Sequence, residues 1–99
     1  MSGGERNPAS LIFAAMKPVK IYTTSYCGYC ARAKELLKAR SIPYEEVDVT
    51  ADDEARDKLV QMAGGRRTVP QIFIGADHLG GYSDLARLAS EGKLDQMLA

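Results

Sequence analysis

Residues 19–30 read VKIYTTSYCGYC, and this stretch gives the clearest indication of the fold. Its first part, Val19–Thr23, alternates apolar and polar side chains and is rich in β-branched residues, which predicts a strand. A short loop follows, and residues 28–40 then carry the apolar stripe of a helix. Cys27 and Cys30 therefore stand directly after a strand and at the start of a helix. A Cys-x-x-Cys pair in this position is typical of a dithiol redox motif.

The position of the pair accounts for the chemistry that it can perform. Unpaired backbone N–H groups and the positive end of the helix dipole stabilise a thiolate at Cys27. The spacing of three places Cys30 one helical turn further on, where it can reach back and close a short disulfide. We therefore expect Cys27 to be the nucleophile and Cys30 the resolving thiol. Two alternatives stay open: a pair of inert buried cysteines, or half of a zinc site, although His78 is the only further strong nitrogen ligand.

The rest of the chain continues the alternation of strands and helices. We predict strands over 44–49, 71–74 and 78–80, a helix opened by a capping box at 50–53 and ended by Gly64-Gly65, a helix capped by Ser83 and ended by Gly92, and a short helix over 94–98. Met62 and Met97 are expected on the core faces of their helices. This order predicts an α/β domain with a four-stranded mixed sheet, two parallel strands plus an antiparallel hairpin, and helices on both faces.

Length and composition exclude several classes of protein. The 99 residues make one small domain, and 45% apolar with 26% charged residues is ordinary for a globular chain. Thirteen basic residues balance thirteen acidic ones, so there is no electrostatic footprint for nucleic acid or an anionic membrane. No apolar stretch approaches the roughly 18 residues of a membrane span. Two cysteines are too few for a secreted disulfide framework.

Residues 1–16 are expected to lie outside the core fold, which we assign to residues 17–99. The apolar patch at 11–16 spans about six residues, shorter than the 7–15 of a signal-peptide core, and no basic segment leads into it. We interpret residues 1–16 as a start-site extension, with a remnant of a targeting sequence as the alternative.

Two further motifs allow both a structural and a functional interpretation. Thr68-Val69-Pro70 precedes a predicted strand, where proline is tolerated, but a cis bond there would be a specific functional feature. In Gly80-Gly81-Tyr82-Ser83-Asp84 the glycines can simply end the hairpin while Ser83 caps the helix. Alternatively, the helix N-terminal amides bind a carboxylate and Asp84 binds an ammonium group.

Taken together, four blocks resemble the glutaredoxin family: 21–23, 26–30, 68–74 and 80–84. The resemblance covers residues 17–99. Thioredoxins share the Cys-x-x-Cys pair but usually have a tryptophan before it, and this chain has none. The resemblance to small dithiol glutaredoxins implies a thioredoxin-like fold and glutathione-dependent reduction of protein disulfides and glutathionylated proteins. The first cysteine, here Cys27, attacks the disulfide, and glutathione then reduces the enzyme.

The resemblance also implies a glutathione site. Its members would be Tyr29, Arg67, Thr68, Val69, Pro70, Gly81, Tyr82, Ser83 and Asp84, with Val69 making main-chain bonds and residues 82–84 holding the γ-glutamyl end. Two positions depart from the family pattern. Gly28 replaces the common proline, as in plant glutaredoxins, some of which bind a [2Fe–2S] cluster between two protomers. The resemblance therefore implies an alternative function, a glutathione-ligated [2Fe–2S] carrier or sensor in a dimeric form. Thr24 replaces a common lysine, so Arg66 or Arg67 is expected to bind the glutathione carboxylate instead, with a solvated pair after a glycine turn as the alternative.

The cysteine pair also indicates an expected compartment and oligomeric state. A catalytic dithiol without structural disulfides fits a reducing compartment, and we expect a cytoplasmic monomer, with an organelle as the alternative. Its expected partners are glutathione and disulfide-containing or glutathionylated proteins, with no nucleic acid, membrane or metal.

Overall fold

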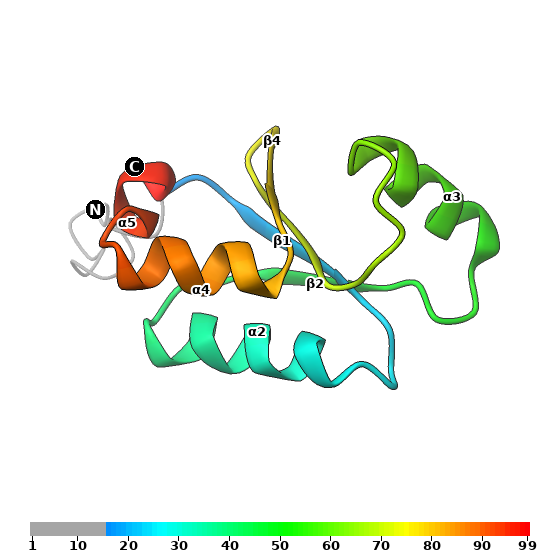
Figure 1. Ribbon diagram of the computed structural model, residues 1–99, viewed down its shortest axis with the longest axis horizontal. Helices are drawn as coiled ribbons and strands as arrows, with labels where there is room; N and C mark the ends of the chain where they lie inside the picture. The colour runs from blue at the N-terminus through cyan, green and yellow to red at the C-terminus, as the bar shows by residue number, and fades with distance from the viewer. Residues whose placement is uncertain (1–15) are drawn as a thin grey trace, which may run out of the picture.

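The computed structural model describes residues 16–99, and the expectation for residues 1–15 lies outside the described part. Its centre is a four-stranded sheet with the order β2-β1-β3-β4 (Figure 1). The strands are β1 (Val19–Thr23), β2 (Glu45–Asp48), β3 (Gln71–Ile74) and β4 (Asp77–Gly80). The β1–β2 pair is parallel, whereas β1–β3 and β3–β4 are antiparallel, so the predicted mixed sheet is confirmed.

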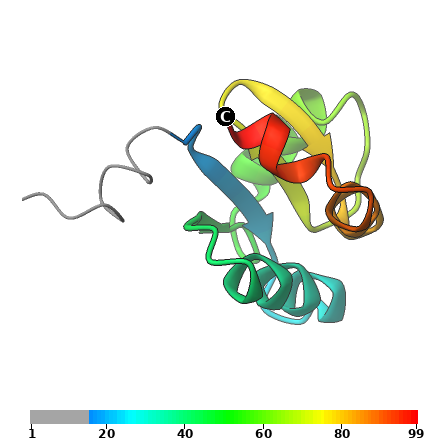
Figure 2. The ribbon, with the colours of Figure 1, turned by 90° about the vertical axis from the view of Figure 1, so that its left-hand side faces the viewer.

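Four helices surround the sheet in the described residues. They are α2 (Gly28–Ala39), α3 (Asp53–Met62), α4 (Tyr82–Ser90) and α5 (Leu94–Leu98). Helices α2 and α4 pack against each other on one face of the sheet, whereas α3 lies on the other side and toward one end (Figures 1 and 2). Over residues 16–99, no helix is long and apolar enough to cross a membrane.

The core lies between the sheet and the α2–α4 layer. Alternation along β1 turns Val19 and Ile21 toward these helices, where both are buried. The predicted stripe of α2 meets them, because Ala33 and Leu37 are 0% and 1% exposed. The other buried members of this cluster are Ile42, Ile72, Ile74, Leu85, Ala89, Leu94 and Leu98.

Two helix starts differ from the sequence prediction. Helix α3 is capped by Asp52, whose carboxylate accepts a hydrogen bond from the Ala55 amide at 3.0 Å; the Thr50 side chain bonds Asp48 instead. Helix α4 begins at Tyr82 with Gly81 as its N-cap, two residues before the predicted cap Ser83. In both cases a carboxylate, a stronger acceptor than a hydroxyl, determines the first turn.

The prediction for Met62 was wrong, while Met97 packs against the core as expected. The Met62 side chain is 47% exposed, although Leu59 and Ala63 beside it are buried. Because α3 covers only one end of its side of the sheet, its predicted apolar face is wider than the surface that it packs against (Figure 1).

Candidate active site

Cys27 occupies the junction between β1 and α2. It is the N-cap of α2, with extended backbone angles (φ −106°, ψ 113°), and its Sγ accepts a hydrogen bond from the Cys30 amide at 3.1 Å. The same sulfur lies 3.5 Å from the Val69 carbonyl oxygen, to which its thiol donates. Cys27 is half-buried. The helix N-terminus thus directs a backbone donor at a sulfur that solvent can reach.

Cys30 differs sharply from Cys27 in its surroundings. One turn into α2, its side chain is only 1% exposed. Burial, followed by the hydrogen bond to Cys27, raises the pKa of the Cys30 thiol to about 12. Both cysteines are free thiols in this structure. The Cys27 thiol is therefore accessible to a partner molecule, whereas the Cys30 thiol is buried one helical turn behind it.

Hydrogen bonds connect the loop before Cys27 to the residues that directly follow β2. The Ser25 amide donates to Thr50 Oγ1 at 2.8 Å, and the Val49 amide donates to the Thr23 carbonyl at 2.9 Å. Thr50 in turn bonds the Asp48 carboxylate, and this bond keeps the pKa of Asp48 below its usual range. These bonds set the point at which the chain turns from β1 into α2, and so the place of Cys27.

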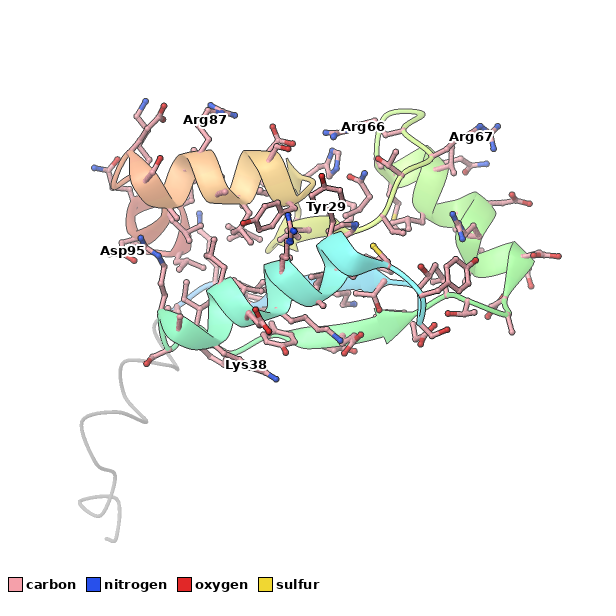
Figure 3. The ribbon with its side chains drawn as sticks, turned by 60° about the horizontal axis from the view of Figure 1, so that its bottom comes forward. Tyr29, Lys38, Arg66, Arg67, Arg87 and Asp95 are labelled. Carbon is pink, nitrogen blue, oxygen red and sulfur yellow. The ribbon has the colours of Figure 1, made fainter. Side chains whose placement is uncertain are left out.

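A groove of about 190 Å³ opens on the same side as Cys27. Its lining comes from the start of α2, the loop after α3 and the start of α4: Tyr29, Arg66, Thr68, Val69, Pro70, Gly81, Tyr82 and Ser83. The Tyr29 and Tyr82 rings face each other with centroids 5.8 Å apart. The Val69–Pro70 peptide bond is cis. Figure 3 shows Tyr29 at the start of α2 opposite the first turn of α4.

Asp84 lies beside this groove and bonds two of the residues that line it, Arg66 and Gly81. Its Oδ2 accepts from the Gly81 amide at 2.9 Å and from Arg66 Nη1 at 3.3 Å, while Arg87 binds Oδ1 at 3.4 Å. The Gly81 amide, helped by Arg66, holds the pKa of Asp84 below its usual range. Gly80, at φ +127°, leaves no room for a Cβ because that atom would collide with the Asp84 carboxylate. A fixed anion, Asp84, therefore lies beside the groove, next to the cation Arg66 and the helix N-terminus that line it.

A buried amide supports the loop that carries Val69. Gln71 is 0% exposed, and its Nε2 donates to the Thr68 carbonyl at 2.9 Å and to the Thr68 hydroxyl at 3.1 Å. Its Oε1 lies 2.6 Å from His78 Nε2. Burial, then the charge of Arg66, lowers the pKa of His78. His78 thus has the structural role that its isolation in the sequence suggests.

The glutaredoxin family model matches residues 19–79, more than half of the chain. The chain belongs to the glutaredoxin family. A glutaredoxin of Pseudomonas aeruginosa is 46% identical over 84 residues, which are 85% of this chain and 99% of the relative. The solution structure of a Brucella melitensis glutaredoxin is 48% identical with a TM-score of 0.76, covering 85% of this chain and 90% of that one. A buckwheat glutaredoxin in complex with glutathione is 33% identical with a TM-score of 0.74, covering 91% and 83%.

Family membership decides how the cysteine pair is interpreted. Glutaredoxins are thiol–disulfide oxidoreductases with a thioredoxin-like fold, so this chain is a thiol oxidoreductase. Among the residues that the structure describes, no three His, Cys, Asp or Glu side chains lie together in an arrangement that could hold a metal ion.

The structure brings together most of the site residues predicted from the sequence. Tyr29, the 68–70 loop and residues 81–83 line one groove in this glutaredoxin, while Cys27 adjoins it through its bond to Val69 and Asp84 through its bond to Gly81. Cys30 is buried behind Cys27 and does not line the groove. Of the two arginines considered for a carboxylate, Arg66 lines the groove, whereas Arg67 does not and projects beyond it beside α3 (Figure 3). Thr24 is 5% exposed, and its hydroxyl is the one buried side-chain oxygen in the described part that lacks a hydrogen-bond partner.

Sequence reasoning missed a charged cluster beside Cys30. Lys34 Nζ lies 3.1 Å from Glu46 Oε2, which also accepts from the Thr23 hydroxyl at 2.7 Å. The Glu46 carboxylate raises the pKa of Lys34, whose positive charge in turn opposes the rise in the pKa of the Cys30 thiol. The available signal was the spacing of four between Cys30 and Lys34, which places both on one side of a helix.

Proposed function

We propose that the chain is a glutathione-dependent oxidoreductase that reduces glutathione mixed disulfides and protein disulfides. One observation carries this proposal: the half-buried Cys27 sulfur caps a helix beside a groove, and the second thiol is buried one turn behind it. This arrangement suits a reaction in which a partner's disulfide reaches Cys27 first and Cys30 acts only afterwards. A reducing compartment is required for such a dithiol, and we assign the chain to the cytoplasm as a monomer.

On a glutathione mixed disulfide, Cys27 alone is sufficient. The Cys27 thiolate attacks the glutathione sulfur, a Cys27–glutathione bond forms, and the substrate leaves as a thiolate that takes up a proton. A second glutathione thiolate then attacks this bond, which releases glutathione disulfide and regenerates the Cys27 thiolate. The Cys30 amide, 3.1 Å from the sulfur, stabilises the negative charge each time it returns to Cys27.

On a protein disulfide, Cys30 completes the reaction. Cys27 attacks one sulfur of the substrate, which forms a mixed disulfide and releases the other sulfur as a thiolate. The Cys30 thiol loses its proton and attacks Cys27, so the substrate leaves fully reduced and a Cys27–Cys30 disulfide remains. Two glutathione molecules then reduce this disulfide. The high pKa of Cys30 keeps it protonated until the mixed disulfide has formed next to it.

The groove offers groups that match each part of glutathione. The exposed main chain at Val69 can pair with the peptide backbone, while Tyr29 and Tyr82 flank the sulfur. The first turn of α4 offers free amides to the γ-glutamyl carboxylate, and Asp84 offers a negative charge to its ammonium group. Arg66 supplies the positive charge for the second carboxylate. The buckwheat structure, solved with glutathione, supports this assignment.

Glutathione-dependent turnover of a glutathionylated peptide, coupled to glutathione reductase, tests the proposal. Cys30→Ser is expected to retain most of this activity, because the first route needs only Cys27. The same variant should lose reduction of an intramolecular protein disulfide, and Cys27→Ser should lose both activities. Turnover by Cys27→Ser, or no turnover by a folded wild type, would overturn the proposal.

A second candidate function is a carrier of a [2Fe–2S] cluster in a glutathione-ligated dimer. Gly28 favours it through the resemblance to plant glutaredoxins with Cys-Gly-Tyr-Cys. A Cβ at this position would meet nothing within 4 Å, so the described chain leaves open space there for a second protomer. One chain offers only Cys27 as an accessible thiolate, so such a cluster would take ligands from two protomers and two glutathiones. Anaerobic purification tests it: a brown dimer that loses its colour in Cys27→Ser supports a carrier, and a colourless monomer contradicts it.

A further inference from the structure

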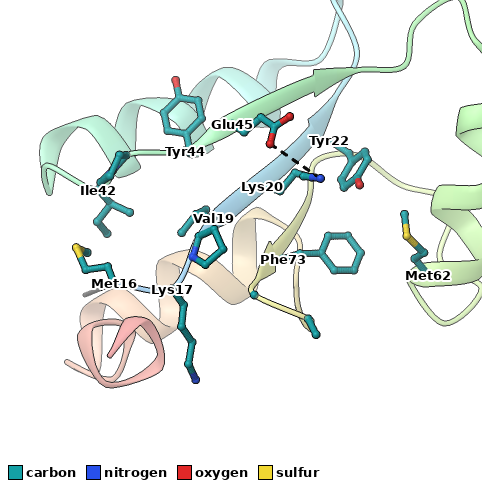
Figure 4. Close-up of a pocket in the computed structure, with 14 residues that line it drawn as sticks. Met16, Lys17, Val19, Lys20, Tyr22, Ile42, Tyr44, Glu45, Met62 and Phe73 are labelled. Atoms are coloured by element: carbon teal, nitrogen blue, oxygen red, sulfur yellow. Dashed lines mark ion pairs between the residues drawn. The ribbon is translucent and has the colours of Figure 1, made fainter. Parts of the chain in front are cut away.

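Strand β2 carries two adjacent glutamates, whose side chains leave the sheet on opposite sides. Glu45 pairs with Lys20 at 4.0 Å on the side away from α2, where both line a groove of about 760 Å³ (Figure 4). Glu46 faces α2 and lies 3.1 Å from Lys34. Each glutamate thus has a lysine partner of its own, and the pair on the α2 side is the one beside a cysteine.

A buried hydroxyl anchors the carboxylate that holds Lys34. The Lys34 Nζ lies 3.1 Å from Glu46 Oε2 and 3.3 Å from its Oε1. Glu46 Oε2 also accepts from the Thr23 hydroxyl at 2.7 Å, and Thr23 is 1% exposed at the end of β1. Both charged side chains are half-buried, so solvent screens them less than it screens fully exposed charges.

Lys34 is also a neighbour of Cys30. It follows Cys30 by four residues in α2, so the two side chains share one side of the helix. The pKa of Cys30 is raised by burial and by Cys27, whereas the Thr24 backbone and the Lys34 charge lower it. The pKa of Lys34 is raised first by Glu46 and also by a charge on Cys30. The ammonium and a Cys30 thiolate therefore stabilise each other.

The influence of Lys34 increases when Cys27 forms a mixed disulfide. In the free enzyme a charge on Cys27 opposes a second charge on Cys30. Once Cys27 is bonded to a substrate sulfur it carries no charge, so this repulsion ends. Burial then remains to disfavour the Cys30 thiolate, and the Thr24 backbone and Lys34 remain to favour it. The lysine therefore contributes most when Cys30 has to react.

We propose that Lys34 is a positioning residue whose charge favours the Cys30 thiolate in the resolving step, and that Glu46 holds it there. This inference rests on the proposed two-cysteine route. In that step the Cys30 thiolate attacks the Cys27 sulfur, the Cys27–Cys30 bond forms, and the bond from Cys27 to the substrate breaks. The substrate leaves as a thiolate. The Cys30 proton passes to solvent, from which the substrate thiolate takes one up, so no further oxidant or reductant is needed.

The expected size of the effect is moderate. An opposite charge within about 4–6 Å changes a thiol–thiolate equilibrium about tenfold or more. Partial exposure of Lys34 and its pairing with Glu46 reduce this. A more basic thiolate is also more nucleophilic, which offsets part of the loss of thiolate. We therefore expect removal of the Lys34 charge to slow the attack by Cys30 about threefold.

Dithionitrobenzoate separates the two thiols in one experiment. Mixed with an equimolar amount of the reduced protein, it reacts at Cys27 and releases one coloured thiolate. Cys30 then attacks the mixed disulfide and releases the second, in a phase whose rate does not depend on reagent concentration. The readout is the second-phase rate relative to the first. Lys34→Gln should lower this ratio about threefold, and Lys34→Arg, which keeps the charge, should recover most of it.

Glu46→Gln distinguishes a role of the charge from a role in packing. It removes the same ion pair between α2 and β2 but leaves Lys34 positive, so it should not slow the second phase. A purely structural link would make both variants slow. Lys38→Gln is the matched control for Lys34, because Lys38 is exposed one turn further from Cys30 on the same helix. Glu45→Gln is the matched control for Glu46 on the other side of the sheet.

Three results would overturn the proposal. The first is an unchanged ratio of the two rates in folded Lys34→Gln. The second is an equal slowing of the second phase in Lys34→Gln and Glu46→Gln. The third is a Lys34→Arg variant that stays as slow as Lys34→Gln. The reagent reacts without glutathione, so this result is independent of glutathione-dependent turnover, and failure of the proposed function is recognised separately.

Discussion

Replacing Cys27 by serine isolates the thiol of Cys30, whose reactivity follows from its burial. Serine is a good N-cap, so helix α2 keeps its first turn in this variant. Burial is the largest cause of the rise in the Cys30 pKa to about 12, and this cause remains when Cys27 is replaced. The quantity to measure is the rate at which this thiol attacks a small aromatic disulfide such as dithionitrobenzoate.

The expected rate can be worked out in two steps. At pH 8 a thiol of pKa about 12 is on the order of one part in 10⁴ thiolate, whereas an ordinary thiol of pKa about 8.5 is roughly one quarter thiolate, a ratio of about 2,400. A thiolate of higher pKa is also more nucleophilic. With a Brønsted coefficient of about 0.45, a pKa difference of about 3.5 increases the rate constant of the thiolate about 40-fold. A Cys30 thiol with the full pKa of about 12 should therefore react about 60-fold more slowly than free glutathione, and this is the upper limit of the pKa effect in the variant. Steric burial at 1% exposure slows the reaction further.

The assay follows the release of coloured thiolate by Cys27→Ser between pH 8 and pH 10. The rate should increase about tenfold per pH unit, because the thiolate fraction does so below the pKa. In denaturant the same variant should react like glutathione, which serves as the internal control. A native rate within a factor of five of glutathione, or a rate that levels off near pH 9, would refute the reasoning.

Four further perturbations follow from the packing and the groove. Leu37→Ala should lower the free energy of unfolding by about 2–5 kcal/mol, measured by denaturant unfolding, because it opens a cavity in the core; a loss below about 1 kcal/mol would contradict the assigned core. Gly80→Ala should lower the free energy of unfolding by more than about 1 kcal/mol and weaken glutathione binding measured by calorimetry. The reason is that the φ of +127° at Gly80 and the adjacent Asp84 carboxylate exclude a Cβ, and an unchanged affinity would contradict this. Asp84 has a lowered folded pKa, so its stabilising contribution is present above its unfolded pKa of about 3.9 and is lost as the pH falls through the folded value. The difference in unfolding free energy between wild type and Asp84→Asn should therefore shrink from pH 7 to pH 3, and a constant difference would show that the carboxylate charge contributes nothing. Thr50→Val should leave stability nearly intact but slow turnover, because it releases the loop before Cys27; equal turnover would contradict the role of this bond.

Much of the fold could be predicted because its patterns are local. Strand β1 is confirmed at Val19–Thr23 and β3 at Gln71–Ile74, since alternation and a short apolar run identify strands directly. The position of the cysteine pair between β1 and α2 is confirmed for the same reason. What could not be predicted is the antiparallel pairing of β1 with β3, because it depends on contacts far apart in the sequence.

Side-chain competition accounts for the remaining differences. At both misplaced helix starts a carboxylate bonds the first turn: Asp52 accepts from the Ala55 amide, and Asp84 accepts from the Gly81 amide. Which of the adjacent arginines lines the groove depends on the path of the loop after Gly64-Gly65, where two positive φ angles redirect the chain. Helical periodicity predicted that Met62 would face the core, but the side chain is 47% exposed because α3 covers only one end of its side of the sheet.

The central claim is that Cys27 exchanges disulfides with glutathione, and trapping the intermediate tests it most directly. Reduced Cys30→Ser is mixed with glutathione disulfide, quenched with acid and analysed by intact and peptide mass spectrometry. The account predicts one glutathione per chain, attached to the peptide that contains Cys27, and its removal by added glutathione. A folded variant that acquires no glutathione, or whose adduct resists removal by glutathione, would contradict the account.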